Sequence, residues 1–572
     1  MKKYMKYIAP YWLYFILAPL CMFVEVACDV QIPYYAGQII NLGVENGDSA
    51  QIMKLTAIML VYILLAISSG VGAAYFATKA SVNFACDVRE DVFKKIQGFS
   101  FVNIDKFSTG SLITRLTNDI TQIQQLVVMC LRMLIRSPGM LIGSIIMAYT
   151  INSQIALVFV VLVPILSIII YVVVRLSYQK FVFLQQKIDE LNSRVREVLV
   201  NIRVIKAFTR EEHEEEKFKN VNSTLRDTSL TAYRITLLQT PLLTIAVNIA
   251  TIVVLWLGSV ALEADQILIG DISALITYLT QVLASVGMLA MIFMQSSKSI
   301  VSSKRISEVL DLDVELADGN NNKTVNTGNI RFDNVSFKYT HSNNEMVLNN
   351  ISVDIKSGET IGIIGSTGCG KTSFAHLIPR LYDTNIGDVY VDGVNVKDYT
   401  LHNLREGVAV VLQNNILFSG TIKDNLMWGD ANANMETIEQ MAQWSASYEF
   451  ISHFKDGYDT TVEQGAVNLS GGQKQRLCIA RALLKKPKII ILDDSTSAVD
   501  TATERKINGH LYNDLKDTTK IIIAQRITSI INASKIIVMD KGEIEAIGTH
   551  EELLENCLTY QEIYNSQMGG LS

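Results

Sequence analysis

One stretch decides the fold of the second half of this chain: Gly365-Ser-Thr-Gly-Cys-Gly-Lys-Thr372. It follows directly on residues 360–365, an apolar run typical of a buried strand, and precedes a helical pattern over residues 373–378. A glycine-rich loop between a strand and a helix is a P-loop, whose backbone N–H groups and helix N-terminus bind phosphates. We expect Lys371 to reach the β- and γ-phosphates of a nucleotide and the Thr372 hydroxyl to bind Mg²⁺.

A second strand supports this nucleotide site. Residues 488–494 read Lys-Ile-Ile-Ile-Leu-Asp-Asp, a β-branched strand that ends in two carboxylates. An acidic residue at such a strand end can bind the Mg²⁺ that bridges nucleotide phosphates, and Asp493 fits that role. Two Asp residues after an apolar run are common in loops, so the pattern is informative only together with the P-loop.

A third motif lies between these two. Leu469-Ser-Gly-Gly-Gln473 precedes a helical pattern over residues 474–484. A Ser-Gly-Gly turn that opens a helix offers bare N–H groups to an anion. In isolation an ordinary glycine turn would be the better interpretation, but here the turn accompanies a P-loop.

The first half of the chain has a different character. Of the 572 residues, 49% are hydrophobic, and the long apolar runs lie before about Ser296. We therefore expect a membrane domain at residues 1–310, a polar linker at 311–328 and a soluble α/β domain at 329–572. The net charge of −6, without a basic arm, argues against nucleic acid as a partner.

Six segments are each able to cross the ~30 Å hydrocarbon layer of a bilayer. They are residues 11–34, 55–77, 126–150, 155–177, 237–262 and 272–294. An even number of spans puts both termini on one side, and Lys2, Lys3 and Lys6 place that side in the cytoplasm. The two long inner loops keep helical periodicity, so we expect the membrane helices to extend into the cytoplasm and contact the soluble domain at their tips.

Four charges fall inside the predicted spans. Glu25 and Asp29 share one face of the first helix, and Arg132 and Arg136 repeat that spacing in the third. Charges in a membrane are costly unless they pair or line a wet cavity. Pairing between these residues is the favoured interpretation, and attraction of a cationic substrate by Glu25 or Asp29 is the alternative.

The order of the motifs resembles the ATPase of an ABC transporter. The resemblance rests on the P-loop, Gln413, Leu469–Gln473, Asp493 and the segment Ser497-Ala-Val-Asp500. It implies an α/β P-loop ATPase of the ABC type behind an all-α six-helix transmembrane domain, with residues 87–119 and 197–211 as intracellular loops. It covers essentially the whole chain and is similar to the exporter class, in which six helices are fused to each ATPase.

The resemblance also assigns roles to residues. It implies that Tyr339 stacks on adenine and that Gln413 links the nucleotide and its Mg²⁺ to the membrane domain. It implies that two chains pair and that two ATPs lie between one chain's P-loop and the other's signature motif. The nucleotide-binding set so predicted is Tyr339, Gly365, Ser366, Thr367, Gly368, Cys369, Gly370, Lys371, Thr372 and Ser373, with Leu469, Ser470, Gly471, Gly472 and Gln473; the metal-binding set is Thr372, Gln413 and Asp493, and the catalytic set is Asp494, Gln525 and Gln413.

Two catalytic positions depart from the family pattern. Where the family has a Glu that polarises the attacking water, this chain has Asp494, and where it has a switch His, this chain has Gln525. A displacement of ~1 Å can cost ~10²-fold in rate, and Gln cannot carry charge. Gln464, upstream of the signature motif, is a milder departure.

The pattern of these departures resembles the degenerate half of a heterodimeric bacterial multidrug exporter. Such an exporter lies in the cell membrane and moves amphipathic or hydrophobic compounds. An active homodimer, a lipid flippase and a peptide exporter are the alternatives.

Overall fold

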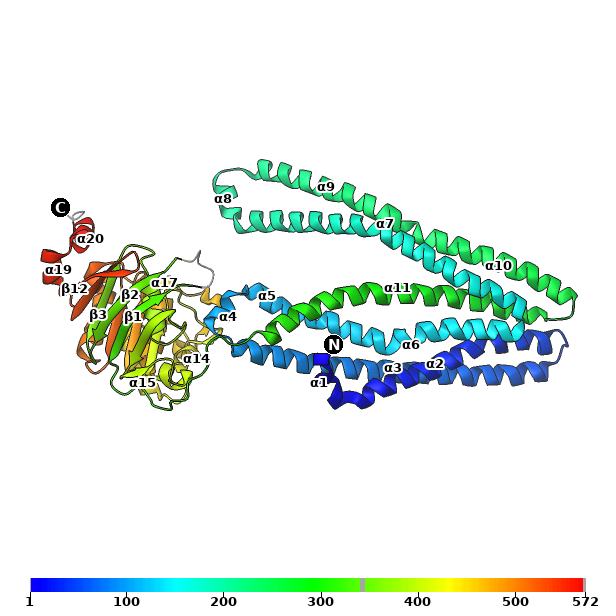
Figure 1. Ribbon diagram of the computed structural model, residues 1–572, viewed down its shortest axis with the longest axis horizontal. Coiled ribbons are helices and arrows are strands. Elements are labelled where there is room, and N and C mark those ends of the chain that lie inside the picture. The colour runs from blue at the N-terminus through cyan, green and yellow to red at the C-terminus, as the bar shows by residue number, and fades with distance from the viewer. Residues whose placement is uncertain (1, 340–344, 569–572) are drawn as a thin grey trace. The chain divides into compact units, whose positions relative to one another are not determined.

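The computed structural model describes residues 2–339 and 345–568, so residues 1, 340–344 and 569–572 of the two predicted domains lie outside it. The chain divides into two compact units (Figure 1). One unit comprises Met1–Gln97 and Thr109–Leu312 and is helical. The other comprises Gly98–Ser108 and Asp313–Ser572 and contains all the strands found in the described residues.

The helical unit contains six stretches that are long and apolar enough to span a bilayer, counted over the described residues. They are Met5–Val44, Ser49–Gln97, Thr109–Ile151, Ser153–Val200, Glu211–Glu263 and Ile269–Asp311. Each contains one of the six segments predicted from the sequence, which confirms the six-helix membrane domain.

The individual helices are long and largely continuous. Their bounds are α1 Met5–Ile8, α2 Trp12–Gln38, α3 Ser49–Gln97, α5 Thr109–Thr114, α6 Ile120–Ile151, α7 Ser153–Val200, α8 Ile202–Ala207, α9 Glu211–Leu237, α10 Gln239–Glu263 and α11 Ile269–Asp311, with shorter turns η1 Lys2–Tyr4, η2 Ala9–Tyr11, η3 Ile39–Val44 and η4 Arg115–Asp119. With 49 residues in α3 and 48 in α7, these helices are each about 70 Å long at 1.5 Å per residue. They are therefore more than twice as long as the ~30 Å hydrocarbon layer is thick.

A cluster of charged side chains joins the first and third spans. The Arg136 guanidinium on α6 donates hydrogen bonds to Glu25 Oε1 and to Asp29 Oδ2 on α2, the latter at 3.0 Å. The Glu25 carboxylate lies against α3 at Gly70, where an added Cβ would be 2.9 Å from Glu25 Oε2. Arg132 does not join the cluster, and its buried Nε has no hydrogen-bond partner in the described chain. The structure thus pairs three of the four predicted membrane charges with one another.

We predict that Arg136→Met lowers the stability of the membrane domain by about 3 kcal/mol, because it leaves two carboxylates without a counter-charge. The matched control is Glu25→Gln/Asp29→Asn/Arg136→Met, which removes all three charges and should regain most of the loss. The temperature at which detergent-solubilised protein loses its monodisperse peak measures both. Equal loss in the single and triple variants would contradict the ion-pair explanation.

The soluble unit is built on a six-stranded sheet of order β12-β11-β3-β10-β9-β6. Its strands are β3 Thr360–Gly365, β6 Val408–Val411, β9 Ile489–Asp493, β10 Thr519–Ile523, β11 Lys535–Asp540 and β12 Glu543–Gly548. All neighbours are parallel except β11 and β12. Every residue of β9 and β10 is buried, as expected of central parallel strands, although β10 begins with the polar residues Thr519 and Lys520.

A second sheet and a set of helices cover this central sheet. The second sheet is antiparallel, of order β2-β1-β4-β5, with β1 Ile330–Phe337, β2 Leu348–Ile355, β4 Ile386–Val391 and β5 Val394–Asn395; β7 Gly420–Thr421 pairs with β8 Thr461–Val462. The helices are α4 Phe101–Asp105, α12 Lys371–Leu377, α13 Leu401–Gly407, α14 Ile422–Met427, α15 Met435–Trp444, α16 Tyr448–His453, α17 Gly471–Leu484, α18 Thr501–Asn513, α19 His550–Asn556 and α20 Leu558–Met568, with turns η5 Gly457–Asp459, η6 Gln464–Ala466 and η7 Ile527–Ser529.

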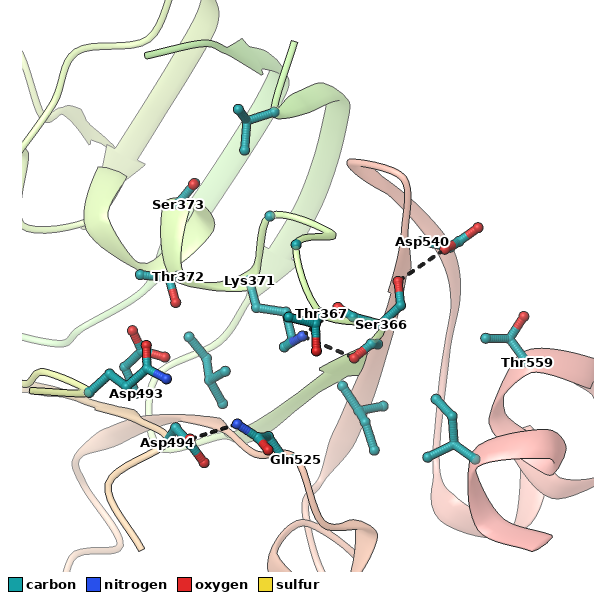
Figure 2. Close-up of a pocket in the computed structure, with 18 of the residues that line it drawn as sticks. Ser366, Thr367, Lys371, Thr372, Ser373, Asp493, Asp494, Gln525, Asp540 and Thr559 are labelled. Carbon is teal, nitrogen blue, oxygen red and sulfur yellow. Dashed lines mark hydrogen bonds between the residues drawn. The ribbon is translucent and has the colours of Figure 1, made fainter. Parts of the chain in front are cut away.

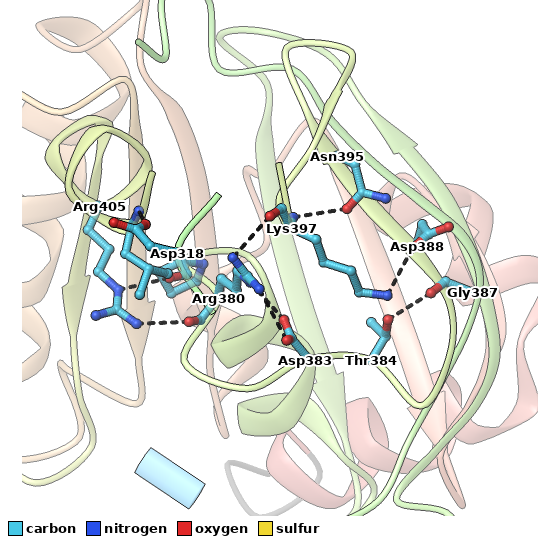
Figure 3. A network of polar contacts seen from close by, with 11 residues as sticks. Asp318, Arg380, Asp383, Thr384, Gly387, Asp388, Asn395, Lys397 and Arg405 are labelled. Atoms are coloured by element: carbon cyan, nitrogen blue, oxygen red, sulfur yellow. Dashed lines mark hydrogen bonds and ion pairs between the residues drawn. The ribbon is translucent and has the colours of Figure 1, made fainter. Parts of the chain in front are cut away.

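A polar network fixes the loop that follows α12 (Figure 3). The buried Arg380 guanidinium donates to Asp383 Oδ1 at 2.7 Å and to the Lys397 carbonyl at 3.1 Å. Arg405 in turn donates to the Arg380 carbonyl at 2.9 Å. Asp318 of the linker accepts from the first N–H of α13 at 2.6 Å. The network thus fixes the loop after α12 relative to the β4–β5 hairpin and α13.

The tip of the first inner loop belongs to the soluble unit. Phe101 of α4 packs on the core beside Tyr382, whose hydroxyl donates to Asp105 Oδ2 at 2.9 Å. Asn103 Nδ2 donates to the carbonyl of Asp313 at 3.0 Å. The chain therefore leaves the membrane unit at Gln97, folds onto its own soluble unit, and returns at Thr109.

Candidate nucleotide-binding site

The P-loop begins where β3 ends. Gly368 and Gly370 have φ angles of +85° and +99°, a region that L-residues with side chains rarely adopt. An added Cβ on Gly370 would also be 2.7 Å from the carbonyl oxygen of Val347. The Lys371 ammonium donates to the carbonyls of Gly365 at 2.9 Å and Ser366 at 2.8 Å, which places its charge over the loop. The loop can therefore surround a phosphate with N–H groups and one cation.

Asp493 ends β9 beside the P-loop. Its side chain is buried, and its Oδ2 has no hydrogen-bond partner in the described chain. Burial raises the pKa of the Asp493 carboxyl, while a hydrogen bond from Thr372 and the charge of Lys371 oppose that rise. A buried, unpartnered carboxylate oxygen next to a threonine hydroxyl fits the donor set that Mg²⁺ prefers at a nucleotide.

Asp494 and Gln525 contact each other directly. Gln525 Nε2 donates to Asp494 Oδ2 at 2.8 Å (Figure 2). Asp494 has a left-handed backbone with φ of +47°, and its N–H donates to the carbonyl of Ile523 at the end of β10. Burial, followed by the neighbouring Asp493 charge, raises the pKa of the Asp494 carboxyl, and the hydrogen bond from Gln525 lowers it. The two residues that depart from the family pattern are thus hydrogen-bonded to each other.

These groups line one cavity of about 770 Å³ (Figure 2). Of the predicted site residues it is lined by Gly365, Ser366, Thr367, Gly368, Gly370, Lys371, Thr372, Ser373, Gln413, Asp493, Asp494 and Gln525. Cys369 does not line it, because its side chain is buried beneath the loop. Tyr339 lies beside the cavity, where its hydroxyl is 2.9 Å from Ser373 Oγ and its ring packs edge-on against Phe337 and Tyr382.

The signature motif does not line this cavity. Ser470 caps α17, accepting a hydrogen bond from the Gln473 N–H, while Gln473 Oε1 accepts one from the Ser470 N–H. An added Cβ on Gly472 would be 2.8 Å from the Ala498 carbonyl, so the motif packs against the 497–500 segment. Leu469 is buried, whereas Ser470 and Gly471 are exposed. A single chain therefore presents the P-loop and the signature motif at separate places.

Part of the cavity wall was not found from the sequence. Its further lining residues include Val347, Asp540, Thr559, Glu562, Ile563 and Gln567. Asp540 ends β11 and accepts a hydrogen bond from Ser366 Oγ at 3.3 Å. The ending of an apolar strand in a carboxylate at Asp540 is the one signal that could have pointed to this residue. The residues of α20 belong to no motif, and only the tertiary structure brings them to the cavity.

The comparisons with known proteins agree with this geometry. Residues 15–286 match the family model described as ABC transporter transmembrane region, and residues 348–497 match the one described as ABC transporter. An ABC transporter ATP-binding protein of Bacillus subtilis, YfiB, is 36% identical over 569 residues, covering 100% of this chain and 99% of the relative. The chain belongs to the ABC transporter family.

Two other similarities extend over nearly the whole chain. The ATP-dependent lipid A-core flippase of Haemophilus influenzae is 31% identical over 93% of this chain and 90% of its own length. The solved structure of a bacterial Atm1-family ABC exporter with ATP bound shares the fold, with a TM-score of 0.80 at 24% identity over 97% of this chain and 99% of that one. This ABC transporter thus has the exporter fold with fused transmembrane and ATPase domains, and it is a multi-pass membrane protein.

We predict that Lys371→Ala weakens ATP binding by roughly 10–100-fold, because a charge-assisted contact to the phosphates contributes about 1.5–3 kcal/mol. The matched control is Lys356→Ala, which removes an exposed lysine outside the cavity. Titration of the purified transporter with a fluorescent ATP analogue measures both. Equal affinity in the two variants would place the nucleotide elsewhere.

Proposed function

We propose that this chain is the degenerate half of a heterodimeric ABC exporter. It binds MgATP on its own P-loop, with Lys371 at the phosphates and Thr372, Asp493 and Gln413 around the metal, but hydrolyses it slowly. The Asp494–Gln525 hydrogen bond carries this proposal. One oxygen of the carboxylate that would orient the attacking water already accepts a hydrogen bond from the switch residue.

Side-chain length supports the same reading. A carboxylate at position 494 reaches one methylene less far than the usual Glu, and ~1 Å of misplacement can cost ~10²-fold in rate. Gln525 donates a hydrogen bond but carries no charge to offset charge that develops on the γ-phosphate. Both changes act on one catalytic step and in one direction.

The signature motif supports the second part of the proposal. The exposed Ser470 and Gly471 open a 14-residue helix, and the Ser470–Gln473 capping box leaves them accessible. In the paired transporter Leu469–Gln473 would cover the partner's nucleotide, and the partner would provide the catalytic Glu and His. The chain thus completes a hydrolytic site that it does not itself contain.

The second inner loop supports dimerisation. At its tip, α8 and its flanks expose the apolar side chains of Ile202, Val204 and Phe208, to 41%, 55% and 73%. Three exposed apolar side chains at one tip are typical of an interface. The tip of the first loop is already docked on this chain's own soluble unit. We propose the ATPase of the second subunit as the surface that covers α8.

The transported compound is proposed to be amphipathic. A cavity of about 350 Å³ in the membrane unit combines apolar and polar groups, which is typical of a site for such molecules. It is lined by Asp29, Ile32, Pro33, Arg136, Met140, Thr277, Gln281, Ala284, Ser285 and Met288. The flippase relative makes a lipid the second candidate, and a drug-accumulation panel run beside a lipid-translocation assay separates the two.

The Lys-rich N-terminus and inner loops support a cell membrane location with cytoplasmic termini.

We predict that the purified chain alone turns over ATP slowly and that pairing with its partner subunit raises turnover at least tenfold. The partner is recovered by copurification from the native membrane. Robust turnover by this chain alone, abolished by Lys371→Ala, would overturn the heterodimer proposal.

We further predict that Asp494→Glu/Gln525→His raises hydrolysis at this site by about 10²-fold, the factor associated with repositioning a catalytic group by ~1 Å. The measurement is ATP turnover of the pair in which the partner's own catalytic Glu has been changed to Gln. Asp354→Glu is the matched control, because it makes the same chemical change at an exposed residue outside the cavity. No gain in the double variant would mean that other residues disable the site.

A further inference from the structure

The C-terminal helix α20 forms one wall of the nucleotide cavity. Four of its residues line that cavity: Thr559, Glu562, Ile563 and Gln567. The proposed function uses none of them. Figure 2 shows Thr559 on the opposite side of the cavity from Lys371.

Gln567 contacts the backbone of the switch segment on both sides of Arg526. Its Oε1 accepts a hydrogen bond from the Ile527 N–H at 2.9 Å, and its Nε2 donates to the Gln525 carbonyl at 2.7 Å. One side-chain amide thus pairs with a donor and an acceptor two residues apart, as a neighbouring strand would. This fixes the backbone from which the Gln525 side chain extends.

The far end of α20 is anchored in the core, so Gln567 is not at the end of a loose segment. Tyr560 is fully buried, and its hydroxyl is 2.7 Å from His550 Nδ1. Thr559 Oγ1 donates to Glu545 Oε1 on β12 at 2.8 Å. Cys557, just before the helix, is buried as well. The helix therefore connects the edge strand of the central sheet with the switch segment.

We propose that Gln567 is a positioning residue for the switch, and that α20 sets how firmly Gln525 is hydrogen-bonded to Asp494. The contacts form one series: Gln567 to the backbone at Gln525, then Gln525 Nε2 to Asp494 Oδ2. Removal of the Gln567 amide frees the switch backbone while leaving Asp494, Gln525 and the P-loop unchanged. The expected effect on ATP hydrolysis rests on the proposed function, whereas the expected effect on the backbone at Gln525 does not.

The first test is hydrogen exchange of the peptide that spans residues 525–530 in the full-length transporter. Gln567→Ala should accelerate exchange there by about 3–10-fold, the effect expected from losing the hydrogen bond that protects the Ile527 N–H. Exchange in the peptide that covers β9 should stay unchanged. The matched control is Asn565→Ala, in the same turn of α20. It removes an exposed side-chain amide that makes no hydrogen bond within the described chain. Equal exchange in both variants would overturn the proposal.

The second test separates this inference from the proposed function. In the Asp494→Glu/Gln525→His transporter, adding Gln567→Ala should lower kcat at this site at least fivefold while KM for ATP changes less than twofold. Gln567→Glu retains the acceptor for the Ile527 N–H but loses the donor to the carbonyl of residue 525. Its kcat should therefore lie between that of the transporter with Gln567 and that of the Gln567→Ala variant. An unchanged kcat would overturn the positioning role. If the double variant gains no hydrolysis, residues other than Asp494 and Gln525 disable the site, so that part of the proposed function fails, and the exchange experiment still decides the role of Gln567.

Discussion

Parallel strands of one sheet end at the same edge, and the nucleotide site depends on that constraint. β3, β9 and β10 are adjacent and parallel, so the P-loop, Asp493 and the switch segment all leave the sheet at one edge. Residues more than 150 positions apart in the chain therefore line one cavity. Because β9 and β10 are buried along their full length, the side chains at their ends, including Asp493, the proposed metal ligand, are held in fixed positions.

The same edge brings together the two residues that depart from the family pattern. Asp494 lies one residue past β9 and Gln525 two residues past β10, and the register of these strands brings the two side chains within hydrogen-bond distance. The Asp494 carboxylate, shorter than a glutamate, accepts a hydrogen bond from the Gln525 amide, which carries no charge. A longer Glu with a His would leave the carboxylate closer to the γ-phosphate. The pair is therefore better understood as one altered unit than as two independent changes.

The sequence was sufficient for the features that depend on local pattern. The P-loop strand, the six spans and the strand ending at Asp493 follow from glycine spacing, hydropathy and alternation, and these are properties of contiguous residues. The contacts of Gln567 were not predictable, because an exposed amide near the C-terminus carries no local signal and its partners lie 40 and 42 residues away. The pairing of Arg136 with Glu25 and Asp29 was open from sequence alone, since spacing shows a shared helix face but not which helices meet.

The docked tip of the first inner loop has a mechanical consequence. α3 is a helix of 49 residues without an internal proline, and it ends at Gln97, directly before the segment that folds onto the soluble unit. A continuous helix resists bending. A displacement of either end of α3 would therefore be carried along the whole helix, as in a stiff lever arm. Gly70 belongs to α3 and lies against the carboxylate of Glu25, so a displacement of α3 would also reach the cluster of membrane charges.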